Sequence, residues 1–177
     1  KAKQLIAEAK AAGVPVGQEL QIPVRQGHFP RAEENAEAVA HMLQEVGLKS
    51  KVIIMETNKW TDWLYATKPE DKHPEFIHMK HGNEIGDASG TVESYMGCGA
   101  RVSLYCNPEA DKLIAAGAKA SGEERVRIYR ELMALLYDDV AVVPLFHLNF
   151  DYGMAKNLVW EPRVDGIMNL WEMKYAE

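Results

Sequence analysis

The chain opens with a helical pattern of apolar residues. Four of them are spaced three or four positions apart and would share one face of a helix: Ala2, Leu5, Ile6 and Ala9. Gly13 stands where a glycine commonly ends a helix. No capping residue precedes this helix, so we expect the chain to be a piece of a longer protein.

Short apolar runs further along predict strands. Between residues 20 and 24 apolar side chains alternate with Gln21 and Pro23, which is typical of a half-buried strand. Pro23 has no N–H to donate, so this strand should lie at a sheet edge or have one unpaired side. The runs 52–55 and 76–79 have the composition of two further strands.

Helical spacing returns between these runs. One predicted face is formed by Val39, Met42, Leu43 and Val46, and Gly47 would end that helix. Trp60, Trp63 and Leu64 indicate a short amphipathic helix. Tryptophans at this spacing belong to a core more often than to a platform for ligand stacking.

The late helices have clear starting signals. Asn107, Pro108 and Glu109 supply a cap, a proline at the first position and an acid near the positive end of the helix dipole. Residues 121–124 fit a capping box, and the apolar face behind it would comprise Val126, Tyr129, Met133, Leu136 and Val140. Asp138 and Asp139 end that helix where its dipole disfavours acids.

The last part of the chain changes character. Residues 140–146 form an apolar run that predicts a buried strand, and residues 148–177 are aromatic-rich with little helical period. Strands alternating with helices favour a partly parallel sheet covered by helices, in an α/β fold.

Composition excludes several functional classes. The 177 residues are 47% hydrophobic and carry a net charge of −6, without the basic clusters that bind phosphates, so nucleic acid is not an expected partner. No apolar stretch approaches the roughly 20 residues that span a bilayer. No nucleophile elbow, P-loop, zinc-protease motif or dinucleotide glycine pattern is present, so an enzyme is not expected.

Several strings together resemble one family in the same order along the chain. They are KAKQLIAEAKAAGVPVGQELQIPV, FPRAEENAEAVAHMLQEVGLKSKVI, HGNEIGDASGTVESYMGCG, YCNPEADKLI and ERVRIYRELMALLYDDVAVVPLFH. They resemble the C-terminal part of the family 5, peptide/nickel-type solute-binding proteins of ABC importers. The resemblance implies the second lobe of a two-lobed type II periplasmic-binding-protein fold, with a mixed sheet flanked by helices.

The resemblance also implies how the chain is divided. Residues 1–147 would form the second, C-terminal ligand-binding lobe, and residues 148–177 would return to a first lobe that this chain lacks. Four aromatic residues of that returning segment would then bury against the missing lobe: Phe150, Tyr152, Trp160 and Trp171.

Candidate ligand contacts follow from the same resemblance. Alignment of Gly86 and Asp87 places Glu84 where peptide-binding members carry an acid for the ligand's ammonium group, with His81, Asn83 and Asp87 in the same loop. The family commonly has Trp at the position of His81 and Pro at that of Ala88, so the ligand's identity stays open. These acids would otherwise be ordinary solvated loop residues.

A second candidate loop follows the first predicted strand. In dipeptide-binding members this loop holds the ligand's carboxylate, which Arg25 could bind in a bidentate manner with His28 beside it. The alternative is that Arg25 is a surface charge. His78 and His81 form an H-x-x-H pattern, but zinc-type sites need three or four ligands and no others are evident, so no metal site is expected.

Cys98 and Cys106 are eight residues apart in a glycine-containing loop. Sequence alone leaves open whether they are bridged. The resemblance to an exported protein favours a disulfide, because disulfides persist in oxidising compartments.

The resemblance implies capture of a small solute between two lobes and its delivery to the permease subunits of an ABC transporter. A di- or oligopeptide is the leading expected ligand, with an opine, a glutathione-like compound, a sugar or a nickel chelate as alternatives. A hydrolase or a pure protein-interaction domain is less expected. No cofactor is implied, and the expected location is periplasmic or lipid-anchored outside the cell.

Overall fold

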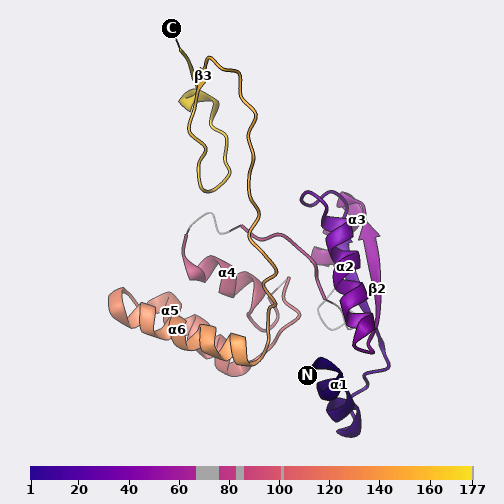
Figure 1. The fold of residues 1–177 in the computed structure, drawn as a ribbon. Coiled ribbons are helices and arrows are strands. Elements are labelled where there is room, and N and C mark those ends of the chain that lie inside the picture. Colours follow the sequence, from indigo (N-terminus) through magenta and orange to yellow (C-terminus); the bar gives the residue numbers. More distant parts are fainter. Residues whose placement is uncertain (67–75, 83–85, 101, 177) are drawn as a thin grey trace.

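A computed structural model of the chain describes residues 1–66, 76–82, 86–100 and 102–176. A body of helices and a small sheet is followed by a long extended segment (Figure 1). The first helix, α1 (Ala2–Ala11), is present as predicted and Gly13 follows it with a φ of 86°. None of its residues is buried, and only Ile6 and Ala9 on its apolar face are partly covered.

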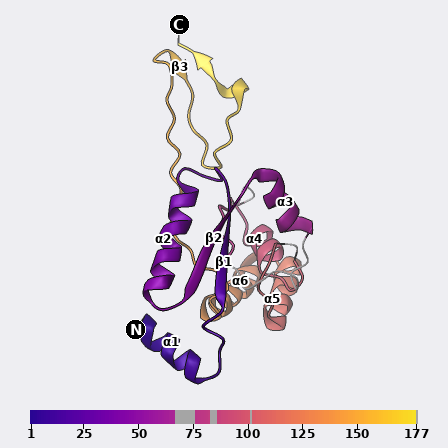
Figure 2. The ribbon, with the colours of Figure 1, turned by 90° about the vertical axis from the view of Figure 1, so that its right-hand side faces the viewer.

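The centre of the body is a β–α–β unit. Strands β1 (Glu19–Arg25) and β2 (Lys49–Met55) run parallel, paired from Glu19 opposite Lys49 to Arg25 opposite Met55. Helix α2 (Ala32–Glu45) connects them and packs on the sheet (Figure 2). The core between them consists of Ile22, Val24, Ala32, Ala36 and Ala40.

The buried face of α2 differs from the predicted one. Its buried stripe is made of alanines, while Val39 and Leu43 are only partly buried and Met42 is 63% exposed. Small side chains let the helix backbone lie close to the strands, so burial here follows the stripe of small residues rather than the largest apolar side chains.

Strand β1 lies at the edge of this two-stranded sheet, as predicted, and on its other side it makes only scattered backbone bonds to residues 76–78. The N–H of Phe76 donates to the Gln21 carbonyl, and the N–H of His78 donates to the Pro23 carbonyl. Pro23 has no N–H to return a bond to this neighbouring segment. Only an isolated bridge between Val24 and His78 therefore forms where the sequence predicts a third strand.

Helix α3 (Thr57–Ala66) supplies a second core. Trp60 and Leu64 are buried with Val102, and Trp63, Ile77 and Met79 pack against them. The two tryptophans therefore belong to the core, as predicted, with ring centroids 5.2 Å apart.

The third core joins three helices: α4 (Ala88–Tyr95), α5 (Pro108–Lys119) and α6 (Gly122–Asp138). Helix α5 begins as predicted, because the Asn107 side chain accepts a bond from the Glu109 N–H at 2.9 Å. The expected capping box of α6 does not form, since Ser121 makes no side-chain cap bond and Gly122 has a φ of 57°. Helix α4 was not predicted from the sequence.

The buried face of α6 consists of Ile128, Tyr129, Leu132 and Leu136. Tyr129 and Leu136 were predicted, whereas Val126, Met133 and Val140 are largely exposed. This face points toward α5 because the Tyr129 ring packs against Gly117, where an added Cβ would come within 2.8 Å of the ring. Glycine at position 117 thus allows the two helices to approach closely.

Residues 140–146 do not form the predicted buried strand. Val140 ends α6 with a φ of 53°, and the Ala141 N–H bonds back to the Leu136 carbonyl at 3.0 Å. The residues that follow are extended and mostly exposed, and no described strand pairs with them. A run of this composition needs a neighbouring strand to become part of a sheet.

The segment from residue 148 onward projects away from the body in both views (Figures 1 and 2). It contains β3 (Leu158–Val159), a short 3-10 helix (Leu170–Glu172) and β4 (Lys174–Tyr175), and the two strands pair antiparallel. Phe150 and Trp171 are largely exposed, whereas Trp160 is buried within the segment itself, with its ring centroid 5.0 Å from that of Tyr152. The segment therefore buries one of its four notable aromatic residues by itself.

Candidate functional site

A hollow of about 320 Å³ lies at the carboxyl end of β1. It is lined by Arg25, His28, Lys80, His81, Gly82 and Tyr95. These residues come from the end of β1, the turn after it, the segment that bridges to β1, and the end of α4. The structure thus brings together three residues singled out in the sequence: Arg25, His28 and His81.

The turn after β1 is held in place by backbone bonds. The Gln26 N–H donates to the Met55 carbonyl at 2.8 Å and the His28 N–H donates to the Arg25 carbonyl at 3.2 Å. The N–H of Gly27, which has a φ of 63°, donates to a Glu33 carboxylate oxygen at 2.8 Å. This bond lowers the pKa of Glu33 and fixes the turn to the start of α2.

Arg25 and His28 enter the hollow with unused bonding capacity. Within the described ranges, the buried Arg25 Nε and His28 Nδ1 have no hydrogen-bond partner. Burial lowers the pKa of His28 to about 4, and the positive charges of Arg25 and Lys80 add to this effect. His28 is therefore neutral at pH 7, while Arg25 supplies a permanent positive charge.

His78 and His81 have separate surroundings. His78 is buried, its Nε2 lies 2.6 Å from Asn35 Oδ1, and burial lowers its pKa. His81 lies with its Nε2 2.8 Å from Thr91 Oγ1 and its ring centroid 4.5 Å from that of Tyr95. Across the described ranges, no group of three His, Cys, Asp or Glu side chains comes together to hold a metal ion.

Asp87 lies outside the lining of the hollow. Its side chain caps α4 by accepting from the Ser89 N–H at 2.8 Å, and it also accepts from Arg125 Nη2 at 2.7 Å. The bonds to Ser89 and Arg125 hold its pKa well below the usual range. Asn83 and Glu84 fall outside the described residues.

Three lining residues were not singled out in the sequence: Lys80, Gly82 and Tyr95. Lys80 directly precedes His81, and its Nζ lies 5.2 Å from the centroid of the Phe150 ring. Tyr95 reaches the hollow only because α4 forms, so its role depends on a helix that the sequence pattern did not predict.

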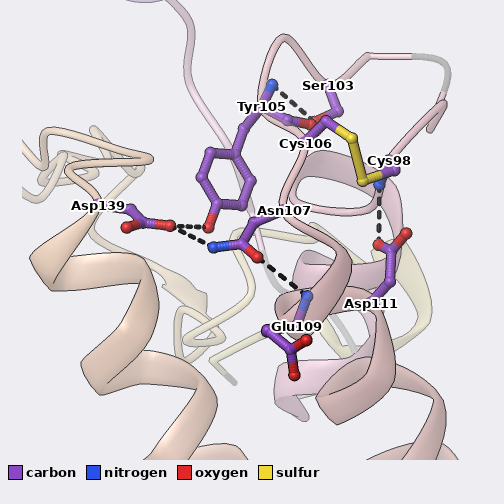
Figure 3. The surroundings of a disulfide bond; sticks show 8 residues. All are labelled: Cys98, Ser103, Tyr105, Cys106, Asn107, Glu109, Asp111 and Asp139. Carbon is purple, nitrogen blue, oxygen red and sulfur yellow. Dashed lines mark hydrogen bonds between the residues drawn. A yellow bond between two sulfur atoms is a disulfide. The ribbon is translucent and has the colours of Figure 1, made fainter.

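Away from the hollow, Cys98 and Cys106 form a disulfide with a Cα–Cα distance of 4.3 Å (Figure 3). The Cys98 N–H donates to Asp111 of α5 at 2.9 Å, so the bridged loop is tied to that helix. Asp139 accepts from the Tyr105 hydroxyl at 2.5 Å and from Asn107 Nδ2 at 2.7 Å. Asp139, an acid that the helix dipole disfavours at the end of α6, therefore joins α6 to the start of α5.

Comparisons with known proteins identify relatives. No protein-family profile matches the chain. A dipeptide-binding protein of Pseudomonas aeruginosa is 25% identical over 166 residues, which cover 89% of this chain and 30% of that protein. A di/tripeptide-binding protein from another strain of this species matches over the same length with the same identity. The chain is a relative of these peptide-binding proteins. It spans about a third of their length.

Solved structures show the same fold. The ABC transporter-associated periplasmic binding protein DppA of Helicobacter pylori, in complex with a peptide, matches with a TM-score of 0.61 and 18% identity over 81% of this chain and 28% of its own. The binding protein AgaA of Agrobacterium tumefaciens, in complex with agropinic acid, matches with a TM-score of 0.62 and 21% identity over 78% of this chain and 28% of its own.

These matches confirm the predicted relationship to solute-binding proteins and the predicted α/β lobe of the type II fold. The relatives are binding proteins rather than enzymes. Within the described ranges, every helix is too short or too polar to span a lipid bilayer.

Proposed function

We propose that this chain is the C-terminal lobe of a solute-binding protein that captures a di- or oligopeptide and delivers it to an ABC permease. The similarity to dipeptide-binding proteins supports the ligand class. The observation that carries the proposal is the hollow at the end of β1, which the cationic Arg25 and the neutral His28 line together.

Arg25 is the group suited to the peptide's C-terminal carboxylate. A guanidinium matches a carboxylate with two parallel N–H···O bonds, and such charge-assisted bonds are stronger than neutral ones. His28, held neutral by its surroundings, can donate one N–H to the same ligand without adding a charge. We propose that Glu84 binds the ligand's ammonium group at the other end.

Binding in this scheme works by closure. Residues 1–147 form one lobe and residues 148–177 connect to the other. A solute that contacts both lobes therefore favours the closed state. No bond of the solute is broken. The exposed apolar residues of the extended segment support this division, because they would be covered by the other lobe. The protein would then act either in the periplasm or outside the cell, where a lipid anchors it to the membrane.

The test is calorimetric titration of the full-length protein with Ala-Ala. The substitution Arg25→Gln should weaken binding roughly 10- to 100-fold, because a charge-assisted bond contributes about 1.5–3 kcal/mol. Arg31→Gln is the matched control, since Arg31 is exposed at the start of α2 and lies outside the lining. Equal losses in both variants would contradict the assignment of Arg25.

A second ligand class is tested in the same experiment. The same fold holds agropinic acid in AgaA, so the scaffold alone does not select peptides. Titration with an opine alongside the dipeptide separates the two. If the opine binds and no dipeptide does, the proposed ligand is no longer a peptide but another solute that carries a carboxylate.

A further inference from the structure

The hollow contains more positive charge than one carboxylate requires. Arg25 and Lys80 both line it, and no acidic side chain is among its described lining residues. A peptide's C-terminal carboxylate carries one negative charge. One of the two cations would therefore remain uncompensated in a hollow that closes away from water, which costs free energy.

Three described acids lie close in the sequence to this hollow. Glu93 precedes Tyr95 by two residues and does not line the hollow. The other two are engaged elsewhere. The Glu33 carboxylate accepts the Gly27 N–H at 2.8 Å, behind the turn that carries His28. Asp87 accepts bonds from Ser89 and from Arg125, which compensates its charge. Neither acid lines the hollow, so the ligand is the available source of negative charge among the described groups.

The positive field of the two cations reaches into the hollow. Arg25 and Lys80 each contribute, after burial, to lowering the pKa of His28 to about 4, and His78 contributes least. Trp60 and Phe29, which also lie beside the His28 ring, carry no charge.

Lys80 is also held toward this site. Its Nζ lies 5.2 Å from the centroid of the Phe150 ring, a cation–π contact that orients the ammonium group and leaves its charge intact. Phe150 comes from the extended segment. Phe146, just before that segment, contacts the turn after β1, with its ring centroid 6.1 Å from that of Phe29. The extended segment thus borders the hollow next to the second cation.

We propose that Lys80 is a specificity-determining residue, and that with Arg25 it selects peptides whose C-terminal residue is Asp or Glu. Arg25 takes the backbone carboxylate and Lys80 takes the side-chain carboxylate of the same residue. This inference rests on the proposed function, and it adds a preference that a single arginine does not create. Charged partners placed in this way discriminate between ligands through complementary charge.

The experiment compares Ala-Glu with Ala-Gln, which have nearly the same size, by calorimetric titration of the full-length protein at pH 7. The wild-type protein should bind Ala-Glu roughly tenfold more tightly, the gain expected for one additional, partly desolvated charge pair. Lys80→Met should reduce this ratio to about one, whereas Lys80→Arg should retain it. Lys49→Met is the control, because Lys49 lies at the opposite end of the sheet, about 20 Å along the strand.

Each outcome decides the matter. A ratio near one in the wild type, or a ratio that survives Lys80→Met, overturns the role of Lys80 while leaving peptide binding intact. Loss of the ratio in Lys49→Met as well would show a general charge effect and also overturn it. If neither dipeptide binds to the wild type, the proposed function fails and this inference fails with it. Unchanged melting temperatures of the variants would show that they fold.

Discussion

The body and the extended segment contain the same kinds of apolar residues, but they bury them to different degrees. In the body, three clusters are buried, and two of them contain residues that are 0% exposed, such as Ile22, Val92 and Leu132. The extended part of the chain comprises the end of the proposed lobe, residues 140–147, and the segment after it. In this part Val143, Leu145, Leu170 and Trp171 are more than half exposed. Apolar composition alone therefore does not decide burial in this chain.

The difference lies in the neighbours of each apolar residue. Two of the three cores in the body are formed by elements that follow one another along the chain, such as α5 and α6, which pack as a pair, whereas the core around Trp60 also recruits Val102 from beyond α4. The extended segment has a two-stranded sheet and two aromatic contacts of its own, which Tyr152 makes with Phe150 and with Trp160. Its other apolar residues need a surface from elsewhere, which is the role we propose for the first lobe.

The largest expected effect comes from matched leucine substitutions in the two regions. Leu132→Ala in α6 should destabilise the 177-residue chain by about 3 kcal/mol, because it leaves a cavity at a fully buried site. Leu145→Ala should change stability by less than about 0.5 kcal/mol, because this side chain is half exposed. Urea denaturation measures both. Similar costs would show that the extended segment is packed after all.

The disulfide offers a second way to weaken the body selectively. Replacing Cys98 and Cys106 by serine should lower the free energy of unfolding by about 2 kcal/mol, because the bridge closes a short loop in the unfolded chain. The hollow should remain, since neither cysteine lines it. Unchanged stability would show that the loop is held by its hydrogen bonds, such as that from Cys98 to Asp111, without the bridge.

Acidification should also act on the body, through His28. The folded state holds the pKa of His28 at about 4, below its ordinary value of 6.5, so the unfolded state binds the proton more readily. Stability is therefore highest above pH 6.5 and falls as the pH drops toward 4. Because the ring is partly exposed, we expect a loss of about 1 kcal/mol at pH 5 from this group.

The control for this pH effect is a second histidine. In the His28→Gln variant the decrease in stability between pH 7 and pH 5 should be smaller, whereas His41→Gln, on the exposed side of α2, should behave like the wild type. His78, whose pKa is lowered by burial, contributes in the same direction in all three proteins. A profile that is identical in all three would remove His28 as a cause.

The smallest expected effect lies at the boundary between the two regions. Tyr105→Phe removes the hydroxyl that donates to Asp139 and should cost about 0.5–1 kcal/mol. Tyr137→Phe, two residues before that aspartate, should be neutral because Tyr137 is 82% exposed. Thermal unfolding of both variants measures the difference. Equal effects would mean that the bond to Asp139 does not tie α6 to the start of α5.

Local signals predicted those parts of the fold that depend on neighbours in the sequence. Asn107 and Pro108 start α5, Gly13 and Gly47 follow helices with positive φ, and Trp60 belongs to a core. These features depend on capping, backbone conformation and helical period, and each of these is set by residues that lie close together in the sequence.

Faces and long-range contacts were predicted less well. The period of α6 was correct, but its buried face was displaced, because Gly117 on another helix accepts the Tyr129 ring. Helix α4 was missed because its cap, Asp87, stands in a glycine-containing stretch that reads as loop. At the hollow, the family resemblance pointed to Arg25, His28 and His81, while Lys80 and Tyr95 became visible only through the approach of separate elements.

By itself, the sequence determined the α/β class, the starts of the late helices and the relationship to solute-binding proteins, because these depend on local pattern and shared motifs. The tertiary structure decided which apolar residues are buried and which charges share a hollow. The physical reason is that burial and electrostatic compensation depend on atoms that are distant in the chain and close in space.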